Sequence, residues 1–346
     1  MGKIGAVGKE NVLIQAGTCA VTILPHFGGK IASIRIGEQE LLQGPLANYA
    51  ARNRTMSFDA SDASGWDECL PSVAACSIET PGGTRSIPDH GDLWRVEWQS
   101  RDQGPGTRDQ GPGTGRFRDQ LEAEAGEGPE TLRGECFSLP LALERTMTLT
   151  ESGKGWELRL DYTVSNTGSS PAPWSWAAHP LFVAEEGDRI VLPDSIETLR
   201  LEGSRGDRLG KSGNQVSWPV ATVADGSHRD LSLARSAESE IGDKLFAGPL
   251  REAENWCALE RPKAGVRIKV GLDVEATPYL GLWMCYGGWP ERPGAKQMCV
   301  AMEPATAPVD SLADTGPWSR VLAGGDCFSW FMDVEIEIMQ REKRDA

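Results

Sequence analysis

Hydrophobic and polar residues alternate along much of the chain with a period of two. WELRLDYTV at 156–164 places its aromatic and aliphatic residues on one side of an extended chain, and Glu, Arg, Asp and Thr on the other. VRIKVGLDV at 266–274 and MDVEIEI at 332–338 repeat the pattern. Successive side chains of a strand point to opposite faces, so this alternation predicts strands with one buried and one solvated face.

Weaker versions of the same pattern occur at 18–24, 30–36 and 143–150, and no long stretch shows a clear helical period of 3.6 residues. The 40 glycines and 22 prolines supply frequent turns between strands. We therefore predict an antiparallel all-β protein, built as a large sandwich, in which residues 1–346 form a single domain.

One segment departs from this pattern. RDQGPGT occurs at 101–107 and again at 108–114, and RFRDQ and the acidic stretch LEAEAGEGPE follow it. A tandem repeat so rich in Gly, Pro and charge does not bury a core. Since the strand pattern is alike on both sides, we interpret 101–130 as a solvated loop inserted within one domain.

Composition and charge narrow the range of partners. The chain has 39% hydrophobic and 25% charged residues, as globular proteins do, and a formal net charge of −15. Nucleic acid calls for clustered Lys and Arg, so this charge argues against it, and it also disfavours an anionic membrane. A neutral small molecule is the expected ligand.

The N-terminal residues, the lengths of the apolar runs and the cysteine spacing indicate the cellular compartment and the kind of metal site to expect. The first residues lack the apolar core of a signal peptide, and no run of about 18 apolar residues occurs. None of the eight cysteines forms a CxxC pair, which disfavours a thiolate zinc site. We expect free thiols in a reducing cytoplasm, and a monomer or homodimer.

Two of the four histidines lie in unusual surroundings. His90, in IPDHGDLW, is flanked by carboxylates and a glycine, as in a surface turn or a site that moves protons. His179, in PWSWAAHPLF, lies among aromatic residues, and because a proline follows it the backbone there is expected to be extended. Its alternative role is a core histidine that bonds to a backbone carbonyl.

Several carboxylates are also candidates. Glu303 ends an apolar run in QMCVAMEPATAPVD, where it either caps the next loop or faces a cavity, because an Asp or Glu is rarely buried without a partner. Asp243, in IGDKLFAGPL, taken alone is a structural loop residue. Asp67 and Glu68 are adjacent in GWDECLPSV, so in a strand at most one of them faces a given pocket.

Tryptophans are frequent near these motifs. The chain has 12 tryptophans and 4 tyrosines. Indole faces stack on the C–H face of a sugar while the indole N–H binds a hydroxyl, although core packing accounts for many tryptophans. Those that flank the polar motifs are Trp66, Trp94, Trp98, Trp174, Trp176, Trp283 and Trp289.

Taken in order, the motifs resemble those of the aldose 1-epimerase, or galactose mutarotase-like, family. None is specific alone, but together they run from about residue 65 to 311. The motifs are GWDECLPSV, IPDHGDLW, WAAHPLF, GDKLF and VAMEPATAPVD. The resemblance implies an antiparallel β-supersandwich with an open cleft, and interconversion of the α and β anomers of free aldoses without metal or cofactor.

The resemblance also implies residue roles. Glu303 matches the general base, His179 the general acid, His90 a histidine that contacts the sugar near its ring oxygen, and Asp243 an aspartate that binds hydroxyls. Arg54, in ARNRT, matches an arginine that contacts the sugar.

Two further candidate substrate contacts are Asp67, from the carboxylate pair, and Trp176, from the tryptophans. The sequence departs from the family pattern after ARNRT, and Pro-Leu-Phe replaces Thr-Tyr-Phe after the second histidine. These two departures indicate a divergent branch of the family. They affect the expected sugar specificity more than the expected acid–base chemistry.

The predicted function is therefore that of an isomerase of carbohydrate metabolism, an aldose 1-epimerase that acts on a free sugar. One alternative is a hexose-6-phosphate 1-epimerase, which requires a cationic phosphate pocket. A second is a non-catalytic carbohydrate-binding protein on the same scaffold. A third is a glycoside hydrolase or lyase, in which Asp67 or Glu68 would form a carboxylate pair with Glu303.

Overall fold

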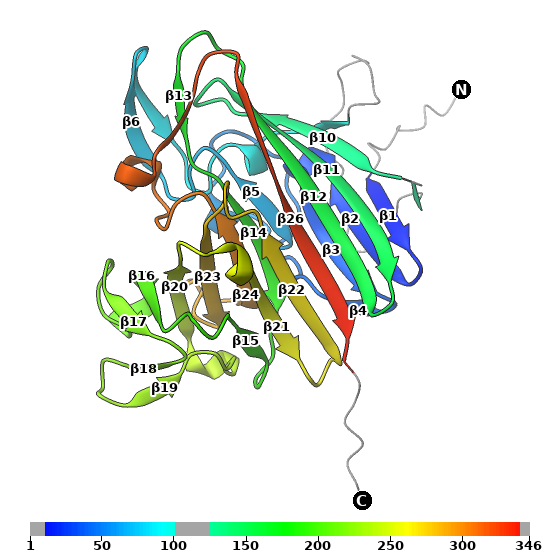
Figure 1. The fold of residues 1–346 in the computed structure, drawn as a ribbon, viewed down its shortest axis with the longest axis vertical. Coiled ribbons are helices and arrows are strands. Elements are labelled where there is room, and N and C mark those ends of the chain that lie inside the picture. Colours follow the sequence, from blue (N-terminus) through cyan, green and yellow to red (C-terminus); the bar gives the residue numbers. More distant parts are fainter. Residues whose placement is uncertain (1–10, 101–124, 127, 340–346) are drawn as a thin grey trace, which may run out of the picture.

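The computed structural model describes residues 11–100, 125–126 and 128–339, and nearly all regular structure in these ranges is β-strand (Figure 1). Almost all neighbouring strands are antiparallel, so the predicted antiparallel all-β class is confirmed. In the predicted loop at 101–130, residues 101–124 and 127 lie outside the described part. The division into one domain stays a prediction. No helix among the described residues is long and apolar enough to cross a membrane.

The larger sheet has 12 strands and carries the candidate site. In spatial order they are β17 (Gln215–Ser217), β16 (Thr198–Ser204), β20 (Ile241–Ala247), β23 (Tyr279–Tyr286), β24 (Met298–Ala305), β14 (Ala177–Val183), β5 (Trp66–Cys69), β3 (Lys30–Ile36), β2 (Cys19–Leu24), β1 (Val12–Ala16) and β9 (Ala125–Gly126), with β4 (Gln39–Glu40) beside β3.

The smaller sheet has eight strands, and Figure 1 shows β26 in red running beside β12. In spatial order they are β15 (Arg189–Val191), β21 (Trp256–Arg261), β22 (Val266–Leu272), β26 (Cys327–Ile338), β12 (Gly155–Asn166), β11 (Leu141–Ser152), β10 (Glu130–Glu135) and β8 (Gln99–Ser100).

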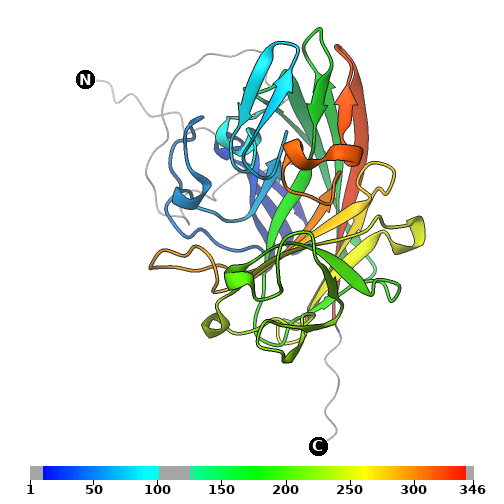
Figure 2. The ribbon, with the colours of Figure 1, turned by 90° about the vertical axis from the view of Figure 1, so that its left-hand side faces the viewer.

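The remaining elements are three two-stranded ribbons and short 3₁₀ turns. Figure 2 shows η8, in orange, beside the ribbon of β6 and β7, in cyan. The ribbons pair β6 (Cys76–Thr80) with β7 (Gly83–Ile87), β13 (Ala172–Trp174) with β25 (Arg320–Leu322), and β18 (Val220–Thr222) with β19 (His228–Asp230). The turns are η1 (Pro25–Phe27), η2 (Phe58–Ala60), η3 (Leu93–Arg95), η5 (Arg205–Asp207), η6 (Ala237–Ser239), η7 (Glu252–Glu254), η8 (Leu312–Asp314) and η9 (Gly316–Trp318).

The main core lies between the two sheets and follows from the alternation seen in the sequence. On β12, Leu158, Leu160, Tyr162 and Val164 are buried, and the residues between them are exposed or half-buried. Burial of each large apolar side chain contributes about 1.5–3 kcal/mol relative to exposure. The predicted half-buried strands at 156–164, 266–274 and 332–338 are confirmed, although the second ends at Leu272.

A fully buried ion pair crosses this core. Glu68 of β5 accepts a hydrogen bond from Arg145 Nη1 of β11 at 2.8 Å, and both side chains have no exposed surface. Tyr162 and Trp176 donate to the same carboxylate, each at 3.0 Å. Since both charged side chains are fully buried, the loss of one partner leaves an uncompensated charge in the core.

We expect Arg145→Met to lower the free energy of unfolding by about 3–5 kcal/mol, because Glu68 then lacks its cation. Denaturant-induced unfolding measures the change. Arg159→Met is the matched control, since Arg159 is partly exposed and pairs with Asp333 at 3.1 Å at the surface. That variant should lose no more than about 1 kcal/mol, and equal losses in both variants would contradict the role assigned to the buried pair.

Candidate active site

The candidate site lies on the face of the larger sheet that points away from the smaller one. In the pairing of β14 with β5, His179 lies opposite Asp67, and the register of β14 with β24 places it opposite Glu303. Glu303 in turn lies opposite Gly281 of β23. Directly opposed residues of antiparallel strands share a face, so the sheet brings these four positions into one row.

His179 and Glu303 are direct neighbours, although 124 positions separate them in the chain. His179 Nε2 lies 3.9 Å from Glu303 Oε1. His179 is 6% exposed and Glu303 is fully buried. Glu303 Oε1 has no hydrogen-bond partner among the described residues, so this oxygen is free to accept a proton from a ligand.

The second oxygen of Glu303 is bound by a lysine that the sequence analysis did not single out. Lys244 Nζ of β20 donates to Glu303 Oε2 and lies 3.5 Å from Asp310 Oδ1. The lysine reaches over Gly281, where a Cβ would lie only 3.2 Å from both Lys244 Nζ and the Cβ of Glu303. Glycine at this position therefore leaves room for the ion pair.

Burial dominates the protonation behaviour of the three groups. It raises the pKa of Glu303, and Lys244 opposes part of that shift. It also works against charge on Lys244, but Asp310 and Glu303 outweigh it and raise the lysine pKa. Burial, helped by the charges of His90 and Lys244, holds the pKa of His179 well below its ordinary value of 6.5. Thus Lys244 is charged and His179 is neutral at neutral pH.

His90 is held beside His179 by its backbone and by an aromatic stack. Its φ of +58° is unusual for a residue with a side chain, and Gly91 follows at φ +69°. The imidazole stacks on Phe58 with ring centroids 3.7 Å apart, meets the His179 ring edge-on at 5.1 Å, and its Nδ1 lies 2.8 Å from Asp89. His90 thus lies in a tight turn that fixes its imidazole at the cavity wall.

These residues surround a cavity of about 280 Å³. His90, His179, Lys244 and Asp310 are among its polar lining residues, and Phe58, Trp283 and Trp289 supply aromatic walls. The other polar residues that line it are Asp59, Asp89 and Gln297. Glu303 lies beneath the lining residues and does not line the cavity. Trp283 and Trp289 are among the tryptophans that flank the sequence motifs, and the structure places them where stacking on a small ligand is possible.

Asp67 lies in the same row but is not open to the cavity. Its carboxylate is 2% exposed and accepts a hydrogen bond from Lys30 Nζ at 2.5 Å. Lys30 also lies 3.2 Å from Asp62, which binds Arg52 at 2.6 Å. The alternation rule is confirmed here, because Glu68 points into the core between the sheets. Asp67, however, belongs to a buried charge network, and its predicted contact with substrate is not supported.

Three further predicted substrate contacts need correction. Asp243 is fully buried, and because it precedes Lys244 in a strand it points to the opposite face, where it binds Ser204 and Arg208. Trp176 is fully buried between the sheets, where it packs on Tyr162 and Trp330. Arg54 is exposed, and its guanidinium lies over the ring of Phe137, 5.1 Å from the centroid. None of the three lines the cavity.

Lys244 and Asp310 are the functional candidates that sequence reasoning missed. Both lie inside motifs that were recognised, GDKLF and VAMEPATAPVD. Alternation offered a signal, because if Asp243 faces one side of a strand then Lys244 must face the other. The choice between the two faces depends on which one borders the cavity, and a single sequence does not contain that information.

We expect Lys244→Met to raise the pKa of Glu303 further, because the substitution removes the nearest cation while burial persists. The carboxyl carbon signal of Glu303, followed by NMR through a pH titration, measures this. A folded-state pKa above the unfolded one means that stability falls as pH rises between the two values. Lys211→Met is the control, since Lys211 pairs with Asp207 in solvent, and an unchanged Glu303 pKa in Lys244→Met would contradict the proposed coupling.

The structure of the whole chain is similar to solved structures of other proteins. No protein-family model and no curated sequence matches the chain. A candidate aldose 1-epimerase from Escherichia coli is similar in structure, with a TM-score of 0.64 and 15% identity over 95% of this chain and 99% of that one. A galactose mutarotase-like protein from Lactobacillus casei has a TM-score of 0.58 and 15% identity over 94% and 100%.

An aldose epimerase homologue from Caenorhabditis elegans has a TM-score of 0.60 and 12% identity over 95% of this chain and 99% of that one. At such low identities the likeness establishes the fold alone. The chain therefore has the galactose mutarotase-like fold, as the ordered motifs predicted, in a strongly divergent sequence.

Proposed function

We propose that the protein is an aldose 1-epimerase-like isomerase that interconverts the α and β anomers of a free sugar. The observation that carries this proposal is the pair of His179 Nε2 and Glu303 Oε1, 3.9 Å apart at the base of a cavity with indole walls. At about 280 Å³ the cavity lies near the lower end of the range for small-molecule sites, about 300–1,000 Å³, which suits a single sugar ring.

Anomer exchange requires one base and one acid on the reacting edge of the ring. Glu303 Oε1 takes the proton of the anomeric hydroxyl, and protonated His179 gives its proton to the ring oxygen as the C1–O5 bond breaks. The open-chain aldehyde turns about the C1–C2 bond, and the two transfers reverse on the other face. No electrons are exchanged, and each proton is returned at ring closure.

Lys244 and His90 support these transfers in the proposed mechanism. Lys244 holds Glu303 Oε2 and favours the ionised carboxylate, while Oε1 remains free for the substrate. Since Glu303 is fully buried, the anomeric hydroxyl must enter between His179 and Lys244 to reach it. His90 would bind a sugar oxygen from the wall of the cavity and orient the ring of His179 beside it.

The geometry disfavours two of the alternatives. A hexose-6-phosphate enzyme needs a free cation for phosphate, but Lys244, the cation that lines this cavity, already lies between Glu303 and Asp310. A hydrolase using Asp67 or Glu68 needs an accessible carboxylate, and both are buried in ion pairs with Lys30 and Arg145. The remaining alternative, a non-catalytic sugar-binding protein, is distinguished from an enzyme by measuring sugar affinity and turnover separately.

We expect Glu303→Gln to lower kcat/KM for anomer exchange about 10²–10⁴-fold while sugar binding persists, because the variant keeps the shape of the residue but loses the base. Polarimetry or exchange NMR with a panel of free aldoses measures turnover, with glucose 6-phosphate run beside glucose. Tryptophan fluorescence measures binding. Glu335→Gln, a change at a partly exposed carboxylate on β26, is the control. A wild-type protein that binds sugars without accelerating exchange would show a binding protein instead.

The pH dependence of exchange follows from the two opposed pKa shifts. The productive form has one proton on His179 and none on Glu303. Burial raises the pKa of Glu303 and lowers that of His179 well below 6.5, so the two pKa values move toward each other. At higher pH His179 has lost its proton, and at lower pH Glu303 has gained one.

We therefore expect kcat/KM, corrected for buffer catalysis, to fall as pH rises toward neutrality, because His179 with its lowered pKa loses the proton that it must donate. Initial rates of exchange measured by polarimetry from about pH 4 to about pH 8 test this. A rate that stays constant up to the alkaline limit would contradict the acid role of His179.

A further inference from the structure

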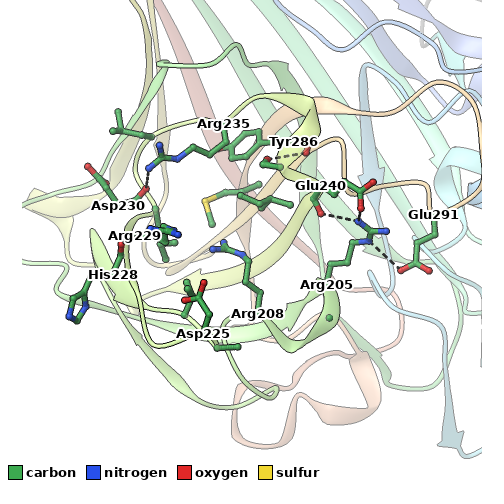
Figure 3. Close-up of a pocket in the computed structure, with 18 residues that line it drawn as sticks. Arg205, Arg208, Asp225, His228, Arg229, Asp230, Arg235, Glu240, Tyr286 and Glu291 are labelled. Atoms are coloured by element: carbon green, nitrogen blue, oxygen red, sulfur yellow. Dashed lines mark hydrogen bonds and ion pairs between the residues drawn. The ribbon is translucent and has the colours of Figure 1, made fainter.

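A second and larger cavity lies on the opposite face of the same sheet (Figure 3). Its floor includes Ile241 of β20 and Met284 and Tyr286 of β23, whereas Lys244 and Trp283 of these strands face the candidate active site. The walls come from η5, from the ribbon of β18 and β19, and from the segment before β20. The cavity measures about 980 Å³ and has its own set of charged residues.

Four arginines border this cavity, and two of them are neutralised by carboxylates. Figure 3 shows Arg205 at one end, directed toward Glu240 and Glu291, which lie 2.7 and 3.9 Å from it. Arg208 binds Asp243, which is fully buried and also accepts a hydrogen bond from Ser204 at 2.6 Å. Asp243 is therefore a positioning residue for Arg208, which explains why a buried aspartate stands on this face.

The other two arginines have no carboxylate partner within 4.0 Å in the described part of the chain. Arg229 donates only to the backbone oxygen of His228 at 3.4 Å, and Arg235 only to that of Asp230 at 3.3 Å. Asp225 accepts from Ser227 and interacts with Arg229 only at longer range, while Asp230 accepts from Ser232 and lies 3.7 Å from Arg189. Neither guanidinium group forms a close ion pair with a carboxylate in the described residues, so both can bind an added anion.

An independent observation comes from the floor of the cavity. Tyr286 is 2% exposed, and its hydroxyl has no hydrogen-bond partner among the described residues. The Nε of Arg208 also lacks a partner. Buried donors are normally satisfied, and leaving one unpaired costs about 1–3 kcal/mol. Two unpaired donors and two guanidinium groups without a close carboxylate therefore border the same cavity, an arrangement that suits an anionic ligand.

We propose that this cavity binds a small organic anion, with a phosphate or carboxylate held by Arg229, Arg235 and the Tyr286 hydroxyl. Guanidinium groups suit such anions because they present paired N–H donors in a plane. The apolar part of the ligand would lie on Ile241, Met284 and neighbouring leucines of the lining. This site is separate from the proposed epimerase site and does not depend on that function.

Titration of the full-length protein with phenyl phosphate, followed by calorimetry or NMR, tests the proposal. Benzoate tests the carboxylate form of the ligand, and benzyl alcohol is the neutral control. We expect saturable one-to-one binding of at least one anion that weakens with added salt. Arg229→Gln with Arg235→Gln should weaken it about tenfold or more, while Arg85→Gln, at an exposed arginine on β7, leaves it unchanged.

Tyr286→Phe is the sharper variant, because its hydroxyl contributes no bond to the fold. We expect it to weaken anion binding several-fold without lowering the melting temperature, a result that a purely structural tyrosine would not give. Absence of saturable binding of both anions would overturn the proposal, as would equal binding of benzyl alcohol. Loss of binding in Trp283→Ala, combined with no effect of the arginine substitutions, would place the anion in the other cavity and would also overturn it.

Discussion

Burial of charge on both faces of one large sheet is the constraint that organises this protein. An ionised group removed from water needs a counter-charge and hydrogen bonds, or it is strongly destabilising. Here Glu68 meets Arg145 in the core, Asp67 meets Lys30, and Glu303 meets Lys244, all with little or no exposed surface. The strands must place each partner within reach, so these ion pairs fix how distant segments of the chain align.

The alternation of strand side chains decides where each charge goes. In two places the sequence sets two charged residues side by side, Asp67 with Glu68 and Asp243 with Lys244. Each pair sends one member to each face of the sheet. One member faces the candidate active site or the charge network beside it, and the other faces the core or the second cavity. A single strand such as β20 therefore serves two cavities whose chemistry is different.

The Glu303–Lys244 ion pair distinguishes this site from a simple acid–base pair. It keeps a buried carboxylate charged without using the oxygen that faces His179, and it depends on the absence of a side chain at Gly281. In the proposed mechanism the lowered pKa of His179 makes it a stronger acid and the raised pKa of Glu303 makes it a stronger base. The fold is shared with aldose epimerase-like structures at 12–15% identity, so these local contacts define the chemistry better than overall similarity does.

The sequence alone determined the class of the protein and several members of its site. The period of two predicted the strands at 156–164 and 332–338, because strand patterning is local. The fold and the association of His179 with Glu303 were predicted by the resemblance of the ordered motifs to a known family. The sequence did not separate Trp176 in the core from Trp283 in the cavity, or Asp243 from Lys244, since both members of each pair suit a strand equally well. Only the tertiary structure decided which member of each pair lines the cavity, because the face of a strand that borders a cavity depends on how the two sheets pack.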